Sequence, residues 1–142
     1  MLCKDLMKTE VECIASDDSA GAAARKMRDE EIGFLPVCDS ESQVIGTLTD
    51  RDIAIRLVAQ DLSLDTPVEE IMTAGVVACA PTDSIERAQS LMGQTKVSRI
   101  LCVEAESGRL AGVISLSDIA QLEQGARIAQ TLREVSEREA RV

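Results

Sequence analysis

Neither histidine, tryptophan nor tyrosine occurs in the chain, and its 142 residues include a single phenylalanine. The lack of histidine excludes catalysis by an imidazole acid or base, and it excludes metal sites that need a histidine ligand. The lack of aromatic rings removes the stacking platforms on which proteins hold nucleic-acid bases. No Gly-rich phosphate loop appears either, and no Ser or Cys has a base that the sequence reveals. We therefore expect a protein that is not an enzyme.

Acidic residues outnumber basic ones by 25 to 15, which gives a formal net charge of −10. Such a charge repels a polyphosphate backbone, so we expect no nucleic-acid partner. Hydrophobic residues make up 45% and charged residues 28%, as in one modest soluble domain. Charges interrupt the first apolar residues at Lys4 and Asp5, and no apolar run approaches the length of a membrane span. We expect a cytoplasmic protein with no membrane partner.

The five cysteines are odd in number, have apolar neighbours and show no C-x-x-C spacing. These features are typical of reduced thiols that pack as small hydrophobic residues, with a redox or metal role as the alternative. We expect no metal site. The cysteines are Cys3, Cys13, Cys38, Cys79 and Cys102.

An internal repeat runs through most of the chain, first with a displacement of 65 residues and then, after one insertion, of 66. A copy of about 50 residues is too small to bury one face by itself, so we expect the copies to pack together. Matched pairs include Met7 with Met72, Asp18 with Asp83, Gly46 with Gly112, Asp52 with Asp118, and Ile53 with Ile119. The predicted boundaries are 2–60 for copy one, 61–67 for a linker, 68–122 for copy two and 123–142 for a helical tail.

Within each copy, the periodicity predicts strand, helix, strand, strand, helix. Asp83 and Glu86 form a capping-box pattern that predicts where the first helix of copy two begins. In copy one we expect these elements at 11–15, 20–28, 34–38, 44–49 and 50–60. In copy two we expect them at 76–80, 83–94, 99–103, 110–115 and from Leu116 on, with a short helical turn at 68–72 before them.

The runs IGFLPVCD at 32–39 and VIGTLTDRDI at 44–53 resemble a CBS domain, and VSRILCV at 97–103 with GVISLSDI at 112–119 resembles a second. Together they resemble the tandem CBS pair of inosine-monophosphate dehydrogenases, chloride channels and the gamma subunit of AMP-activated kinase, over roughly residues 2–122. The resemblance implies an α/β (α+β) fold of two β-α-β-β-α repeats, packed sheet to sheet in a pseudo-two-fold arrangement with a C-terminal helical extension. It also implies a regulatory module with up to two clefts for adenosine-containing ligands.

Each copy carries the motif Gly, two apolar residues, Ser or Thr, two free positions and Asp. We expect the hydroxyl of Thr49 or Ser115 to donate to a phosphate, beside unpaired amides at the start of a helix. The carboxylate of Asp52 or Asp118 would accept both ribose hydroxyls. The alternative is a capping box, in which these side chains satisfy only the backbone of the helix.

Two arginines favour an anionic ligand. Arg51 stands in the first turn of a predicted helix, where the helix dipole disfavours a cation unless an anion is bound. Arg99 matches a position where the resemblance implies a basic contact to phosphate, and a guanidinium offers two parallel hydrogen bonds. The alternative is that both pair with surface carboxylates.

The adenine base needs an aliphatic slot, for which the alternative is ordinary core packing. We assign Val11, Cys13, Ile14, Val77, Cys79 and Pro36 to this slot. The sequence does not select among AMP, ADP, ATP, S-adenosylmethionine and dinucleotides, and we expect no covalent cofactor.

Residues 121–142 are predicted to continue the last helix, with an apolar stripe of Leu122, Ala126, Ala129 and Leu132, and with Ile128 and Val135 close to it. Because CBS pairs commonly dimerise through their helices, we expect a homodimer. The resulting hypothesis is a stand-alone sensory module for adenine nucleotides, of the energy-sensing kind, that acts in trans on an unknown effector protein. The alternative is a structural or interaction homodimer without a nucleotide.

Overall fold

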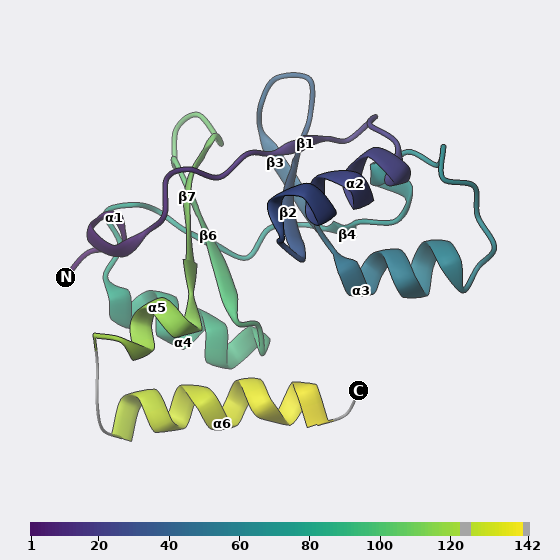
Figure 1. The fold of residues 1–142 in the computed structure, drawn as a ribbon. Coiled ribbons are helices and arrows are strands. Elements are labelled where there is room, and N and C mark those ends of the chain that lie inside the picture. The colour runs from purple at the N-terminus through teal and green to yellow at the C-terminus, as the bar shows by residue number, and fades with distance from the viewer. Residues whose placement is uncertain (123–125, 141–142) are drawn as a thin grey trace. The chain divides into compact units, whose positions relative to one another are not determined.

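Figure 1 shows the computed structural model, which describes residues 1–122 and 126–140. The chain forms two compact units: unit 1 comprises Met1–Val11 with Val77–Val142, and unit 2 comprises Glu12–Val76. These units divide the chain differently from the sequence repeats, because the first residues of each copy, 2–11 and 68–76, pack with the other copy. Each unit nevertheless contains the predicted order of strand, helix, strand, strand and helix, which is confirmed.

Unit 2 is built on a sheet with the strand order β1-β2-β3-β4, in which β1 and β2 are parallel and the other pairs antiparallel. Its elements are β1 (Ile14–Ala15), α2 (Ala20–Glu30), β2 (Phe34–Cys38), β3 (Val44–Thr49), α3 (Asp50–Asp52), the π-helical turn η1 (Ile53–Val58), the 3₁₀ turn η2 (Val68–Glu70) and β4 (Thr73–Ala74).

Unit 1 is built on a sheet with the order β5-β6-β7, again parallel for the first pair and antiparallel for the second. Its elements are α1 (Cys3–Leu6), β5 (Ala78–Cys79), α4 (Ile85–Thr95), β6 (Arg99–Val103), β7 (Leu110–Ser115), α5 (Leu116–Ala120) and α6 (Ala126–Ala140).

The first helix of each copy begins at a serine. Ser19 caps α2 by accepting a hydrogen bond from the amide of Ala22, and Ser84 caps α4 by accepting from the amide of Arg87. The predicted start at Asp83 is therefore wrong by one residue. The Asp83 carboxylate instead accepts from the amide of Ala80, 2.9 Å away, and so closes the turn before the helix.

The helix predicted at 50–60 is present but irregular. α3 continues into η1, where the amide of Ala59 bonds to the carbonyl of Ala54, five residues earlier. This wider turn buries Leu57 and leaves Ile55 and Val58 exposed. A π-turn of this kind is uncommon and is found often near functional sites.

Each unit has its own core of aliphatic side chains from its sheet and first helix. In unit 2, Leu35 and Leu48 are fully buried beside Met27 of α2. In unit 1, Ile100 and Ile114 are fully buried, beside Met92 of α4. Full burial of one such side chain contributes about 1.5–3 kcal/mol to the free energy of folding.

The last strand of each copy is crossed by a segment that leads into the other copy. In unit 2, residues 71–74 form this crossing segment, and β4 pairs with β3 at Gly46 and Thr47. In unit 1, residues 7–9 do the same, since Lys8 and Val113 exchange two backbone hydrogen bonds of 2.9 and 3.0 Å. The sequence repeat gave no sign of this exchange.

The C-terminal residues do not continue the preceding helix. α5 ends at Ala120 and a separate α6 packs against α4 and α5, while residues 123–125 and 141–142 lie outside the described part. The predicted stripe is wrong in part, because Leu122, Ala129 and Leu132 are exposed. Thr131 and Val135 form the buried face. The side chains of Ala126 and Ile128 lie outside the described residues.

Candidate functional site

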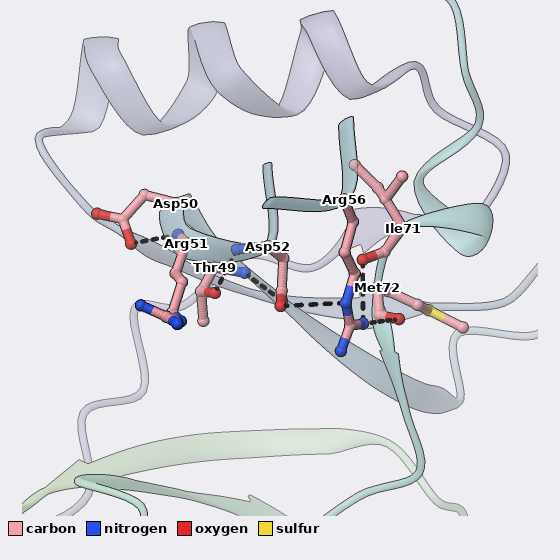
Figure 2. A network of polar contacts seen from close by, with 7 residues as sticks. All are labelled: Thr49, Asp50, Arg51, Asp52, Arg56, Ile71 and Met72. Atoms are coloured by element: carbon pink, nitrogen blue, oxygen red, sulfur yellow. Dashed lines mark hydrogen bonds and ion pairs between the residues drawn. The ribbon is translucent and has the colours of Figure 1, made fainter. Parts of the chain in front are cut away.

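Thr49 and Asp52 lie at the junction between β3 and α3. The Thr49 Oγ1 accepts a hydrogen bond of 3.1 Å from the Asp52 amide, and the Asp52 Oδ2 accepts one of 3.0 Å from the Thr49 amide (Figure 2). This is a capping box, as the alternative interpretation expects. It leaves the hydroxyl proton of Thr49 available as a donor and leaves the Asp52 Oδ1 outside the cap.

Ser115 and Asp118 repeat this geometry at the junction between β7 and α5, with distances of 3.1 and 3.0 Å. The Ser115 hydroxyl also lies 2.9 Å from the hydroxyl of Ser117, which replaces Arg51 in copy two. Burial acts to raise the pKa of Asp118, but hydrogen bonds from Ser115 and the ammonium of Lys8 outweigh it, so the pKa is lowered from 3.8.

The prediction that free amides face a phosphate is wrong for copy one. The amide of Asp50 donates to the carbonyl of Gly33, the amide of Arg51 donates to the Asp50 carboxylate, and the Asp52 amide serves the cap. In copy two, the amide of Leu116 donates to the carbonyl of Ser98. A ligand at either junction would therefore meet side chains more than backbone amides.

The two arginines occupy different places at the two junctions. Arg51 is exposed, and its guanidinium has no hydrogen bond or ion pair within residues 1–122 and 126–140. Arg99 begins β6 directly opposite Ser115 in the antiparallel register, where Phe34 stands opposite Thr49 in copy one. Each junction thus has one arginine nearby, from the helix in unit 2 and from the neighbouring strand in unit 1.

A second cation reaches the remaining carboxylate oxygen at each junction. The Nε of Arg56 lies 3.9 Å from the Asp52 Oδ1, and the Nζ of Lys8 lies 3.5 Å from the Asp118 Oδ1. Sequence reasoning missed both cations. Arg56 had a signal in its i,i+4 spacing from Asp52, whereas Lys8 lies far from Asp118 in the sequence and carried none.

Comparison with known families identifies this arrangement. Residues 3–59 and 68–125 each match the CBS domain family. The chain belongs to the CBS-domain proteins. It carries two CBS repeats, and the two junctions described above occupy the same place in each.

Two curated relatives resemble the chain over most of their length. It is 36% identical over 117 residues to the CBS domain-containing protein YhcV of Bacillus subtilis, a match that covers 82% of this chain and 81% of YhcV. It is 31% identical over 119 residues to Hypoxic response protein 1 of Mycobacterium tuberculosis, which covers 83% of this chain and 82% of that protein.

Solved structures of CBS proteins share the fold. Hypoxic Response Protein I with two coordinated zinc ions has a TM-score of 0.78 at 30% identity, covering 87% of this chain and 100% of that one. The CBS domain pair of protein MJ0100 in complex with 5′-methylthioadenosine and S-adenosyl-L-methionine has a TM-score of 0.75 at 26% identity, covering 86% and 94%. CBS domain protein PAE2072 from Pyrobaculum aerophilum, complexed with AMP, has a TM-score of 0.76 at 22% identity, covering 96% and 99%.

The residues predicted to hold the base divide into two groups. Ile14, Pro36 and Cys79 are buried in the sheets of their CBS repeats, so they have the environment that core packing predicts. Val11 and Cys13 are partly exposed, and Val77 is exposed by 36%. Only the second group presents side-chain surface to a ligand.

Cys13 and Cys38 form a disulfide in the first CBS repeat, with the sulfur atoms 2.15 Å apart. The prediction of five reduced thiols is therefore wrong for this pair. The bond joins the segment before β1 to the end of β2, where Ala15 pairs with Cys38. Parallel pairing of β1 with β2 brings residues 25 positions apart in the sequence together, and no local spacing reveals such a contact.

The other three cysteines are free and buried together in unit 1, as predicted for small hydrophobic residues. Burial raises the pKa of Cys3 to about 11, that of Cys79 to about 12 and that of Cys102 to about 11. Within the described residues, no group of three or more Cys, Asp or Glu side chains is arranged to hold a metal ion. No described helix is both long and apolar enough to cross a membrane.

Proposed function

We propose that the protein is a sensory module that binds an adenosine-containing nucleotide at the Thr49–Asp52 and Ser115–Asp118 junctions and acts in trans on an effector protein. The observation that carries the proposal is the presence, in both repeats, of a hydroxyl and a carboxylate at one strand–helix junction with an arginine beside them. The CBS pair of MJ0100, at 26% identity, holds 5′-methylthioadenosine and S-adenosyl-L-methionine, which supports an adenosine-containing ligand, although neither of these molecules carries a phosphate.

Each side chain keeps capacity for a ligand after the capping box is made. A carboxylate accepts about four hydrogen bonds, and the Asp52 Oδ2 uses one of these for the Thr49 amide. The cis-diol of a ribose supplies two donors that suit the remaining positions. The Thr49 hydroxyl accepts from the Asp52 amide and retains its proton for a phosphate oxygen.

The arginines supply the charge that a phosphate needs. Arg51 serves the site in unit 2, where it projects from the start of α3 away from Arg56 (Figure 2). Arg99 serves the site in unit 1 from its position opposite Ser115. A guanidinium can bind two phosphate oxygens in parallel, which suits both residues to a phosphate.

The base contacts in this proposal are fewer than the sequence suggested. Val11, Cys13 and Val77 present surface, whereas Ile14, Pro36 and Cys79 support the sheets from the core. An aliphatic slot without aromatic stacking favours a ligand that gains most of its affinity from ribose and phosphate. Adenosine ligands that lack a phosphate should therefore bind more weakly than those that carry one.

The relatives that match this chain over most of their own length include a CBS domain-containing protein and an uncharacterised protein, whereas the relative named as homoserine O-acetyltransferase matches over only 23% of its length. We therefore propose a regulatory output without turnover of the nucleotide. A homodimer is part of the proposal, because Ile55 and Val58 of η1 are 49% and 64% exposed and a second copy would cover them. Sedimentation of the full chain tests this, and a monomer at all concentrations removes the dimer from the proposal.

The test is isothermal titration of the full chain with AMP, ADP, ATP and S-adenosylmethionine, repeated on Asp52→Asn and Asp118→Asn. Asparagine keeps one oxygen for the cap but loses the second acceptor for the diol. The matched controls are Asp18→Asn and Asp83→Asn, since these carboxylates accept from Ala15 and Ala80 amides in turns outside the junctions. We expect the affinity for nucleotide to fall by about tenfold or more in the junction variants only. A loss of this size corresponds to one hydrogen bond to a charged group.

Equal affinity in the junction and control variants contradicts the assignment of the carboxylates. No binding of the native chain to any of the four adenosine ligands contradicts the sensory function. That result favours the structural or interaction homodimer, in which the capping boxes do no more than stabilise the starts of α3 and α5.

A further inference from the structure

The contacts of Arg56 connect the Asp52 carboxylate to the crossing segment of unit 2. Its Nε lies 3.9 Å from the Asp52 Oδ1, while its Nη1 donates to the carbonyls of Met72 at 2.8 Å and Ile71 at 3.3 Å (Figure 2). The Asp52 side chain is only 13% exposed, so the pair is partly shielded from solvent. One guanidinium thus contacts both the proposed ribose acceptor and the backbone that crosses Gly46.

Unit 1 achieves the same connection with a different residue. The Nζ of Lys8 lies 3.5 Å from the Asp118 Oδ1, and the backbone of Lys8 is itself the part of the crossing segment that pairs with Val113. By the repeat, Lys8 corresponds to Thr73 and not to Arg56. A cation tied to the crossing segment therefore reaches the second carboxylate oxygen in both units from non-equivalent positions in the sequence.

Each crossing segment leads directly into the first strand of the other copy. β4 ends at Ala74 and β5 begins at Ala78, while residues 7–9 precede β1 at Ile14. Residues 75–77 and 10–13 thus join each crossing segment to the first strand of the other copy. The segments are held closely, because a Cβ on Gly46 would stand 2.5 Å from the Thr73 carbonyl oxygen.

Ribose and cation compete for the same oxygen. A diol that takes both carboxylate oxygens weakens the pair with Arg56 or Lys8, and a phosphate nearby attracts the released cation. The guanidinium of Arg56 cannot follow the phosphate without lengthening its bonds to Met72 and Ile71. The crossing segment therefore responds to occupancy of the site.

We infer that Arg56 and Lys8 are positioning residues that couple nucleotide occupancy at Asp52 and Asp118 to the crossing segments, and so couple the two CBS repeats. This inference rests on the proposed nucleotide function. By linkage, the effect is reciprocal: a ligand in one repeat changes the affinity of the other repeat by the same factor as the reverse. Couplings of this kind are typically about 5- to 150-fold in affinity.

The test is amide hydrogen exchange of the full chain with and without saturating AMP or S-adenosylmethionine, following the amides of the crossing segment at residues 71–74. In the native protein, ligand should change their exchange rates by about fivefold or more. In Arg56→Met, which keeps the aliphatic stem, the nucleotide should still bind by calorimetry, with an affinity changed by the loss of the competing cation, while the exchange response is lost. Lys8→Met should remove the response of residues 7–9 in the same way.

The matched control is Arg87→Met, because Arg87 forms a comparable i,i+4 pair with Asp83 at 3.7 Å outside both junctions. The inference is overturned if the exchange response persists in Arg56→Met, or if Arg87→Met removes the response to the same extent. In either case, the proposed function still holds as long as the nucleotide binds. If titration shows no binding of any nucleotide, the proposed function and this inference fail together. Binding without any exchange response in the native chain overturns the inference alone.

Discussion

The sulfur of Met72 lies 2.9 Å from the point where a Cβ on Gly46 would stand. In unit 1, the sulfur of Met7 lies at the same distance from the corresponding point on Gly112. The backbone is as close, since the carbonyl oxygens of Thr73 and Lys8 are 2.5 and 2.8 Å from these points. The motif glycine is therefore required because the crossing segment passes directly over it.

Gly46→Ala and Gly112→Ala should each lower the free energy of unfolding by about 1–3 kcal/mol, because the added methyl group meets backbone that cannot move freely. Urea unfolding followed by circular dichroism measures this. Gly33→Ala is the matched control, since its Cβ would meet only the end of the Asp50 side chain, at 2.7 Å. Equal losses of unfolding free energy in all three variants would show that the crossing segments can shift at little energetic cost.

The pH dependence of stability should contain a contribution from Asp118. Its pKa is lowered in the folded protein from the ordinary value of 3.8, so its stabilising effect is full above 3.8 and is lost as the pH falls through its folded value. Urea unfolding of the native protein and Asp118→Asn, from neutral pH down past 3.8, should give a difference that shrinks with acidity. Lys8→Met should reduce that difference. A difference that stays constant with pH is incompatible with an ionised, stabilising Asp118.

The three free thiols should be unreactive in the folded protein. Because their pKa values are raised from 9.0 to about 11 or 12, they remain protonated at mildly alkaline pH, and burial blocks access. A thiol reagent should label them only on unfolding. Stability should be full below pH 9.0 and should fall as the pH rises toward the folded values, since the unfolded thiols ionise first. Rapid labelling of Cys3, Cys79 or Cys102 in the native protein would contradict their buried position.

Reduction of the Cys13–Cys38 disulfide should destabilise the protein by about 3 kcal/mol, because the bond closes a loop with a sequence separation of 25. Urea unfolding with and without dithiothreitol measures this difference. A variant with both Cys13→Ala and Cys38→Ala is the control, because its stability should not respond to the reductant. An equal response of both proteins would mean that dithiothreitol acts elsewhere in the chain.

The sequence supported the repeat, the order of elements and the two junctions. Thr49 and Asp52 could be placed because hydroxyl, carboxylate and helix start lie within one turn, so local spacing determines their geometry. The start of α4 could not be chosen correctly, since both Asp83 and Ser84 are good caps. The Ala80 amide donates a hydrogen bond to the Asp83 carboxylate. Asp83 therefore belongs to the preceding turn, and Ser84 is left to cap the helix.

Contacts between segments that lie far apart in the sequence could not be predicted from it. Cys13 meets Cys38 through the register of parallel strands, and Lys8 meets Asp118 through the crossing of β7 by the N-terminal residues. The face that α6 buries was also misplaced. A stripe centred on Leu132 and one centred on Val135 are close on a helix, and contact with α4 and α5 decides between them.

The crossing segments mean that one unit is inserted into the other, although the sequence looks like a simple tandem repeat. Unit 2 is one continuous stretch, Glu12–Val76, inserted between the two pieces of unit 1. A fragment that stops at the end of the sequence repeat, near residue 60, would lack β4 and leave Gly46 uncovered. Removal of unit 2 would instead require a new peptide connection between Val11 and Val77. Fragments of this protein should therefore be cut at the insertion points and not at the boundaries of the repeat.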